Sequence, residues 1–293
     1  MTAKIISGTK IAEEIRAELK GKVKELKAKG ITPGLAVVLM GDDPASLSYV
    51  SAKAKGAEEV GVYEETFRLP ATATEGDLFE LVSRLNKDAR FHGILVQLPL
   101  PKHISEQKMT SAVDPAKDVD CFHPVNVGKL LIGQPDFLPC TPHGVVQLLV
   151  RSGYDPAGKH VVICGRSSIV GKPLMAMLVQ KAKGANATVT VCHTGTRDIA
   201  QFTRQADIVI AAAGSPRLIK ADMVKPGVVV IDVGVNRVPD PTAKSGFRLV
   251  GDADFDAIKE KAEAITPVPG GVGPMTVTML LHNTIEAARR RAK

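Results

Sequence analysis

One glycine-rich stretch, VVICGRSSIVGKP (161–173), nearly fits two phosphate-binding patterns. As a G-x-x-x-x-G-K-[ST] loop it has one residue too many between Gly165 and Gly171, and Pro173 stands where a hydroxyl should coordinate magnesium. As a G-x-G-x-x-G loop it has Ser167 at the second glycine, and its last glycine falls one place late. The pattern alone leaves two interpretations open, a variant phosphate loop and a tight turn with solvated side chains.

The surroundings of this loop favour a dinucleotide. Gly165 directly follows a buried-type strand and Gly171 opens an apolar helical run, so backbone amides and a helix N-terminus would face a phosphate. The next strand, ATVTVC, runs into Cys192–Thr194 without the carboxylate that usually holds the ribose of NAD. Arg166 lies inside the loop, and a guanidinium suits a ribose phosphate. NADP is therefore favoured over NAD.

A phenol and an ammonium stand four residues apart in SLSYVSAKAKGAEE, as Tyr49 and Lys53. On a helix they project from one face. Taken alone, this pair is typical of a solvated helix face, and the neighbouring Lys55 shows how common lysine is here. Tyr-x-x-x-Lys is also the catalytic pair of short-chain dehydrogenases. In that family the glycine-rich loop comes first, and here the order is reversed.

Four further polar residues between Gln97 and His123 could take part in chemistry. Gln97 ends a buried-type strand before a run of prolines, and capping that strand end is the alternative to a catalytic role. Asp118 and Asp120 flank a valine in an irregular segment, where turn or helix capping is the alternative. His123 could act as a base, although a single loop histidine is more often structural.

The elements that must position these residues alternate between strand and helix. Strands are expected near Ile5 and at 34–41, 62–69, 93–100, 160–165, 187–192, 207–214 and 227–234, with a last one near Ile265. Helices are expected at about 9–29, 49–60, 75–86 and 275–290. Proline and glycine are frequent from 99 to 142, which indicates a passage from one unit to a second. The apolar strands predict mostly parallel sheets covered on both faces, an α/β fold.

Composition narrows the function class. The net charge of +7 (38 Lys and Arg against 31 Asp and Glu) suits anionic ligands, but no Trp, three Tyr and eight Phe offer little stacking surface to a nucleic acid. We therefore expect no nucleic-acid partner. The four cysteines, at 121, 140, 164 and 192, form no C-x-x-C and predict free thiols and no metal site. Without a signal-peptide core or a membrane-length apolar run, the expected location is cytoplasmic, with no membrane partner.

Seven ordered pieces of the sequence resemble one family over nearly the whole chain. They are SYVSAKAK, GILVQLPLP, KDVDCFHPVNVGKL, PCTP, GRSSIVGKP, VIDVGVNR and TPVPGGVGPMT. Their order and approximate spacing are similar to those of the bifunctional methylenetetrahydrofolate dehydrogenase/methenyltetrahydrofolate cyclohydrolases. The resemblance implies two three-layer α/β domains with a folate cleft between them, and a homodimer. Residues 1–139 and 276–293 would form the folate-binding catalytic domain, and residues 140–275 a Rossmann-type NADP-binding domain.

The family's chemistry would be one-carbon metabolism that supplies purine biosynthesis. The dehydrogenase step moves a hydride from methylenetetrahydrofolate to NADP, and the cyclohydrolase step hydrolyses methenyltetrahydrofolate to 10-formyltetrahydrofolate. The substrates would be tetrahydrofolate derivatives, including polyglutamylated forms. Hydride transfer depends on stacking and position, whereas water addition needs proton transfers.

The resemblance also implies residue roles. Lys53 would be the acid/base group, Gln97 would hold it, Tyr49 would offer an aromatic plane to the folate, and Asp120 would accept from the pterin. Folate would be bordered by Pro269, Gly270 and Gly271. The cofactor would be bound by Gly165, Arg166, Ser167, Ser168, Thr194 and Val235.

One position departs from the family pattern. The family usually reads Asp-Val-Asp-Gly-Phe, and this chain has Cys121 in place of the glycine. If the glycine serves a positive φ angle, cysteine imposes strain, and if the glycine only leaves room, cysteine narrows the pocket. No formyltetrahydrofolate synthetase activity is expected, because the chain has no spare domain and no valid P-loop.

Two other classes stay open on the sequence. A dehydrogenase of another substrate class would keep the Arg166 loop and use Tyr49 and Lys53 differently. A basic nucleic-acid-binding protein with a vestigial nucleotide fold would owe its charge to phosphates, and its binding would depend on salt.

Overall fold

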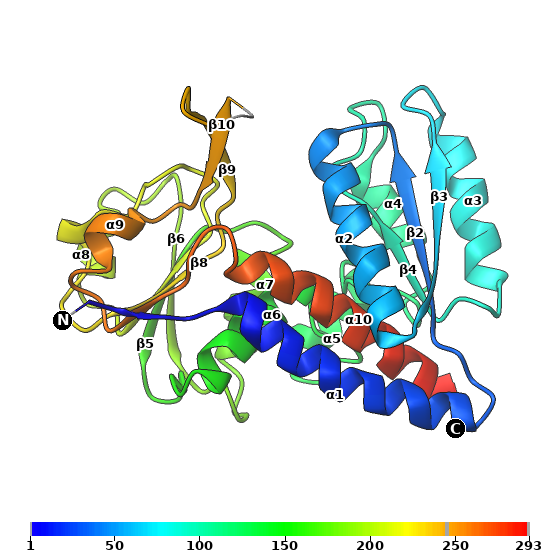
Figure 1. The fold of residues 1–293 in the computed structure, drawn as a ribbon, viewed down its shortest axis with the longest axis horizontal. Helices are drawn as coiled ribbons and strands as arrows, with labels where there is room; N and C mark the ends of the chain where they lie inside the picture. The colour runs from blue at the N-terminus through cyan, green and yellow to red at the C-terminus, as the bar shows by residue number, and fades with distance from the viewer. Residues whose placement is uncertain (1, 244–245, 292–293) are drawn as a thin grey trace. The chain divides into compact units, whose positions relative to one another are not determined.

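The computed structural model describes residues 2–243 and 246–291, and the chain divides into two compact units. We call them the three-stranded unit (Glu13–Cys140 and Val277–Lys293) and the six-stranded unit (Met1–Ala12 and Thr141–Thr276), after their parallel sheets (Figure 1). Met1, Lys244, Ser245, Ala292 and Lys293, which belong to the ranges expected for the domains, lie outside the described residues.

The sheet of the three-stranded unit has β2 (Gly34–Met40) at its centre, with β3 (Tyr63–Leu69) on one side and β4 (Gly93–Val96) on the other. Both pairings are parallel. Every residue of β2 is buried, so its sequence is apolar throughout instead of alternating. The edge strand β3 is mostly half-buried and carries the polar run YEETFRL.

The helices that lie wholly within this unit begin and end at capping residues or glycine and proline positions. They are α2 (Pro44–Val60), α3 (Glu75–Lys87), α4 (Glu106–Ala112) and α5 (Pro124–Leu131). The Asp43 carboxylate accepts from the Ser46 N–H at 2.8 Å to cap α2, which ends at Gly61 in the left-handed conformation. A capping box between Thr74 and Asp77 begins α3. This helix packs Leu78, Leu81, Val82 and Leu85 against β2 and β4 in one apolar core.

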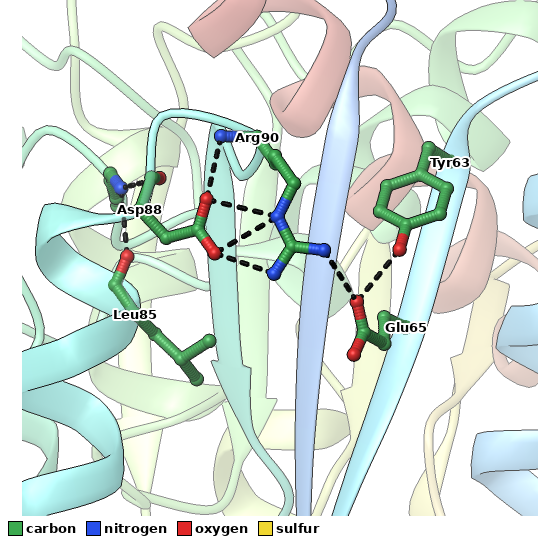
Figure 2. Close-up of polar contacts among 6 residues, drawn as sticks. Tyr63, Glu65, Leu85, Asp88 and Arg90 are labelled. Carbon is green, nitrogen blue, oxygen red and sulfur yellow. Dashed lines mark hydrogen bonds and ion pairs between the residues drawn. The ribbon is translucent and has the colours of Figure 1, made fainter.

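A polar cluster ties the connection after α3 to the edge strand (Figure 2). The Arg90 guanidinium donates to the Asp88 carboxylate, at 2.7 Å for the closest pair, and lies 3.4 Å from Glu65 Oε2. Tyr63 donates its hydroxyl to the same Glu65 oxygen at 2.7 Å. Beneath this cluster the buried Lys117 ammonium donates to the carbonyl oxygens of Leu85 and Asp88, and so caps the C-terminal end of α3.

The six-stranded sheet has the order β1-β11-β8-β7-β5-β6, and every pairing in it is parallel. Its strands are β1 (Lys4–Ile5), β5 (His160–Cys164), β6 (Thr188–Cys192), β7 (Ile208–Ala211), β8 (Val229–Asp232) and β11 (Ala264–Ile265). In the register Cys164 pairs with Cys192 and with Ala211, and Ala211 pairs with Asp232. The carboxyl ends of four strands are therefore level at one edge, and the topological switch point lies between β5 and β7.

The chain also contains shorter helices and a β-hairpin. They are α6 (Cys140–Arg151), α7 (Gly171–Leu178), α8 (Ile199–Thr203), η1 (Ala221–Met223), α9 (Phe255–Ile258) and the antiparallel pair β9 (Asn236–Pro239) and β10 (Phe247–Val250). Two long helices, α1 (Gly8–Ala28) and α10 (Val272–Arg291), begin in the six-stranded unit and continue into the other. Gly8 packs so closely that a Cβ there would lie 1.7 Å from the Gly271 carbonyl oxygen.

Several boundaries differ from the sequence expectation. The first twelve residues were expected in the folate-binding domain, but β1 pairs with β11 and places them in the six-stranded unit. The strand β4 ends at Val96 instead of residue 100, since Pro99 and Pro101 have no N–H to donate to a ladder. The short helices α4, α5, α8 and α9 and the β9–β10 hairpin were not predicted, because such short segments show too little periodicity.

Candidate active site

Lys53 lies on α2 with only 6% of its surface exposed, and its ammonium donates to Gln97 Oε1 at 2.6 Å. Gln97 follows β4, and its own Nε2 donates to the Leu98 carbonyl oxygen at 2.6 Å. Because the amide nitrogen is engaged there, the amide oxygen must face the lysine. The sequence alternative of a solvated helix face does not hold for Lys53, and the structure brings the two expected residues together.

Two further groups act on the charge of Lys53. Burial lowers the pKa of the Lys53 ammonium, and the nearby Asp120 carboxylate opposes this shift, as do Cys140 and Glu64. Burial likewise raises the pKa of Asp120, and Lys53 and a hydrogen bond with the Cys140 thiol oppose that shift. Lys53, Gln97, Asp120 and Cys140 thus form one polar cluster inside the three-stranded unit, with Gln97 bonded to Lys53 and the other two acting on its charge.

Cys140 was not among the expected site residues. Its buried thiol donates to the Val119 carbonyl oxygen at 3.4 Å, and burial raises its pKa well above the ordinary value. The residue stands at the start of α6, far from Asp120 in sequence, so no local spacing could have indicated the contact.

Tyr49 lies one helical turn before Lys53 and is 38% exposed. An exposed aromatic ring beside a buried ammonium can pack on a planar ligand. The position of Tyr49 fits the role expected from the sequence.

Asp118 and His123 take the structural roles that the sequence left open. Asp118 is buried and accepts from the N–H groups of Phe122 and His123 and from the Asn126 amide, at 2.8 to 3.1 Å. His123 begins α5, and its Nδ1 accepts from the Val125 N–H at 3.1 Å. Both side chains are used in holding the turn that carries Asp120.

The conformation of Cys121 shows which consequence the missing glycine has, backbone strain or a narrowed pocket. Its φ is +63°, in the left-handed region that glycine favours, so the cysteine is strained. Its side chain is 1% exposed, and the thiol donates to the Phe137 carbonyl oxygen at 3.3 Å. Burial raises the pKa of this thiol far above the ordinary value. The thiol therefore points into the protein core, where an alkylating reagent cannot reach it.

The glycine-rich loop lies at the switch point of the six-stranded sheet, between β5 and α7. A Cβ on Gly165 would lie 2.0 Å from the Ala212 carbonyl oxygen, and a Cβ on Gly171 would lie 2.1 Å from the Gly165 carbonyl oxygen. The Ser167 hydroxyl accepts from the Val170 N–H at 3.1 Å. Only glycine fits at either end of this tight loop, so packing requires both glycines.

The side chains that could meet a dinucleotide are exposed around this loop. Arg166, Ser167 and Ser168 are exposed, as is Thr194 just beyond the end of β6. Val235 follows β8 and is 48% exposed. All of them follow the carboxyl ends of strands, where α/β sheets bind ligands, so the structure brings these expected residues to one edge.

Two buried aspartates beside this edge were also missed by the sequence reasoning. Asp252 is fully buried and Asp232 is 3% exposed, and together they accept from the loops that follow β7 and β8. Burial raises the pKa of Asp232 to about 6. Both residues read as ordinary strand-end or turn aspartates in the sequence, so only their burial distinguishes them.

Pro269, Gly270 and Gly271 belong to the six-stranded unit, in the loop before α10. Gly270 has φ +97°, and a Cβ on Gly271 would lie 2.5 Å from the Pro267 carbonyl oxygen. The Gly270 carbonyl oxygen accepts from the Thr9 N–H at 3.1 Å. The two glycines are therefore required by the loop itself.

The comparisons with known proteins agree over the whole length of the chain. Residues 139–292 match the family model of the tetrahydrofolate dehydrogenase/cyclohydrolase NAD(P)-binding domain, and residues 6–120 match that of the catalytic domain. The chain belongs to the tetrahydrofolate dehydrogenase/cyclohydrolase family.

Individual members of the family are similar throughout. The bifunctional protein FolD of Syntrophus aciditrophicus is 61% identical over 292 residues, which cover 100% of this chain and 99% of the relative. The FolD structure from Campylobacter jejuni has a TM-score of 0.93 and 48% identity, and covers 99% of both chains. The methylenetetrahydrofolate dehydrogenase-cyclohydrolase of Trypanosoma brucei, solved with NADP cofactor and an inhibitor, has a TM-score of 0.95 and 43% identity, and covers 100% of this chain and 99% of that chain.

In residues 2–243 and 246–291, no group of three or more His, Cys, Asp or Glu side chains could hold a metal ion. Within the same residues, no helix has the length and apolar character needed to cross a membrane.

Proposed function

We propose that this chain is a bifunctional enzyme of one-carbon folate chemistry. It oxidises methylenetetrahydrofolate to methenyltetrahydrofolate with NADP and hydrolyses the product to 10-formyltetrahydrofolate. The observation that carries the proposal is the buried Lys53 ammonium, which donates to Gln97 at 2.6 Å. The same chain has a glycine-rich loop at the switch point of its six-stranded sheet. Membership of the family supplies the substrate class.

NADP fits the residues around the glycine-rich loop. The loop has no room for side chains at Gly165 and Gly171, so its backbone amides can approach a diphosphate closely. Arg166, Ser167 and Thr194 are exposed there to hold the ribose phosphate, with Ser168 beside them. When bound, NADP supplies the acceptor for the hydride. Val235 is the residue we assign to the nicotinamide half.

Lys53 is the acid/base group of the hydrolysis. Because burial lowers its pKa, its Nζ can give up and regain a proton near neutral pH more readily than an exposed lysine can. The bond to Gln97 fixes the direction of the Nζ, and the Gln97 bond to the Leu98 carbonyl oxygen fixes the glutamine. The Lys53 Nζ can therefore take a proton from the attacking water and return a proton to the substrate during ring opening.

Three sets of residues are assigned to the folate. Asp120 accepts from adjacent ring donors of the pterin, since one carboxylate can accept two neighbouring N–H groups. Tyr49 offers its exposed ring as a packing plane. Pro269, Gly270 and Gly271 border the folate by their lack of bulk. The range of substrates would include polyglutamylated folates.

Three finer assignments belong to the same proposal. The enzyme acts as a homodimer, as the resemblance implies. It works in the cytoplasm, and its four cysteines, all free and buried, suit a reducing compartment. Its product supplies one-carbon units to purine biosynthesis. We propose no nucleic-acid partner, because the aromatic residues are few.

An absorbance assay tests the activity directly. Methenyltetrahydrofolate should form from methylenetetrahydrofolate with NADP and should then decay faster than in buffer alone. A chain that binds RNA or DNA in a salt-dependent way without NADP turnover would contradict the proposal. A chain that oxidises hydroxy compounds but not the folate would contradict its substrate class.

A further inference from the structure

The loops that follow β7 and β8 are held by two buried carboxylates that the roles assigned above leave unused. Asp252 Oδ2 accepts from the N–H groups of Ala213 and Gly214 at 2.6 and 2.8 Å, and its Oδ1 accepts from the Ser215 N–H at 2.9 Å. Three consecutive backbone amides thus converge on one side chain. Such a nest of amides is a common anion site, and here it is filled from within the protein.

Asp252 also reaches the second loop. Its Oδ1 accepts from the Asn236 Nδ2 at 2.8 Å, one residue after the exposed Val235. Asp232 holds the other side of that valine, because its Oδ1 accepts from the Gly234 N–H at 2.9 Å. Val235 therefore stands between two residues that are each fixed to a buried carboxylate.

The two carboxylates are joined to each other through the backbone. Asp232 accepts from the N–H groups of Asp252 and Ala253 at 2.9 and 2.8 Å. The backbone packs closely around both carboxylates. A Cβ on Gly251 would lie 1.9 Å from Asp232 Oδ2, and a Cβ on Gly234 would lie 2.2 Å from Asp252 Oδ1. A shift of either side chain must move the loops that it holds.

The loop after β7 in turn supports the phosphate loop. The Ala212 carbonyl oxygen lies against Gly165, where a Cβ would approach it to 2.0 Å. The Gly165 N–H donates to the Cys192 carbonyl oxygen at 2.8 Å, which joins the phosphate loop to the end of β6. A continuous set of contacts therefore runs from Asp252 through residues 212–215 to the glycine-rich loop.

We propose that Asp232 and Asp252 are positioning residues that set the affinity of this chain for the dinucleotide. They do so by fixing the loops after β7 and β8 at the carboxyl edge of the six-stranded sheet. The inference rests on the proposed function, because these loops matter to affinity only if the dinucleotide binds at that edge. Neither carboxylate touches the reacting atoms.

The decisive variant is Asp252→Asn, which keeps the shape of the side chain. Each carboxylate oxygen of Asp252 accepts from two donors. The amide of asparagine replaces one of these oxygens by an NH₂ group, which cannot accept, so at least two hydrogen bonds are lost. We expect the NADP Kd, measured by calorimetry, and the NADP KM to rise about tenfold to a hundredfold, as for the loss of two such bonds. Asp232→Asn should act in the same direction.

The cyclohydrolase step supplies an internal control. Hydrolysis of added methenyltetrahydrofolate uses Lys53 in the other unit, so its kcat should stay within about twofold of the parent in Asp252→Asn. A merely structural role would lower both activities together and would not separate the NADP KM from the hydrolysis rate. The matched control is Asp254→Asn, the same change two residues along at a half-buried carboxylate that pairs with the exposed Lys220, and it should leave the NADP Kd unchanged.

Each outcome decides between the proposals. A parent chain that does not bind NADP would sink the proposed function. If the parent binds NADP and a folded Asp252→Asn variant binds it with equal affinity, only the positioning role of Asp232 and Asp252 is contradicted. If Asp252→Asn does not fold, Asn236→Ala tests the idea. It removes the 2.8 Å hydrogen bond to Asp252 together with a longer one, at 3.4 Å, to the Val250 carbonyl oxygen, and the NADP Kd should rise about fivefold. An unchanged Kd in that folded variant would overturn the inference.

Discussion

Substitution of Lys53 should affect the dehydrogenase and cyclohydrolase activities differently. Lys53→Met keeps much of the side-chain volume and removes the Nζ, so hydride transfer, which depends on position, should survive at least in part. Hydrolysis should fall about a hundredfold to ten-thousandfold, the usual loss for a positioned acid/base group. Progress curves at the methenyl absorbance should show the methenyl product accumulate and decay near its solvent rate. A parental hydrolysis rate in Lys53→Met would remove the lysine from the mechanism.

Asp120→Asn serves as the comparison for that variant. It disturbs the proposed grip on the pterin, which both steps share, and should therefore depress both activities. A selective loss of one activity in Asp120→Asn would contradict the role assigned to Asp120.

Arg166 should set the choice of cofactor. The side chain is exposed beside the glycine-rich loop, and residues 192–194 at the end of β6 include no carboxylate to hold an unphosphorylated ribose. Arg166→Ala should weaken NADP by about 1.5 to 3 kcal/mol, the worth of a hydrogen bond to a charged group, and should leave NAD nearly unaffected. Titrations of parent and variant with both cofactors measure this. Equal losses for the two cofactors would contradict the assignment to the phosphate.

Cys121 combines a strained backbone with a well-packed side chain. Cys121→Ala loses the thiol bond to Phe137 and keeps the left-handed φ, whereas Cys121→Gly loses more atoms and relieves the strain. We expect the glycine variant to be the more stable of the two by about 1 kcal/mol. Urea unfolding of both variants gives the order. If the alanine variant were the more stable, the conformational strain at this position would be too small to matter.

At the scale of elements, the helix α3 ends on a buried ammonium. Burial, with the charge of Arg291 acting in the same direction, lowers the pKa of Lys117 to about 8. In the unfolded chain a lysine keeps its proton up to about 10.5. Between these values the unfolded chain binds more protons than the folded chain, so this group makes the free energy of unfolding rise as the pH is raised.

The measurement for Lys117 is a comparison of pH slopes. The parent should gain stability relative to Lys117→Met as the pH rises from about 8 to about 10.5, the window set by the folded and unfolded pKa values. Urea unfolding at several pH values in this window provides the difference. The same slope in both chains would mean that Lys117 keeps its ordinary pKa despite its burial.

At the scale of the whole molecule, the two units should respond differently to NADP. The residues assigned to the cofactor all belong to the six-stranded unit. NADP at about a hundredfold over its Kd should stabilise the form that binds it by about 2.7 kcal/mol. Hydrogen exchange in β5 to β8 should slow more than exchange in β2 to β4 of the other unit. Equal slowing in both sheets, or none in either, would contradict a cofactor site confined to the six-stranded unit.

The sequence by itself determined the strands of the two parallel sheets, the long helices and the family. Apolar runs such as 34–40 and 160–164 are local, and their lengths and flanking glycines are enough to predict buried parallel strands. The glycine-rich loop and the strand end at 192–194 are local too, so the cofactor class could be inferred from them. Ordered motifs along the chain then indicated the family.

Only the tertiary structure decided how distant residues meet. The burial of Lys53, its bond to Gln97 and the approach of Asp120 and Cys140 depend on packing between segments far apart in sequence. The direction of the Cys121 thiol, the pairing of β1 with β11 and the carboxylates of Asp232 and Asp252 are of the same kind. Local periodicity reports which face of an element is apolar. It carries no information on which other element covers that face. The covering element supplies the partners of a buried side chain, and the burial shifts its pKa.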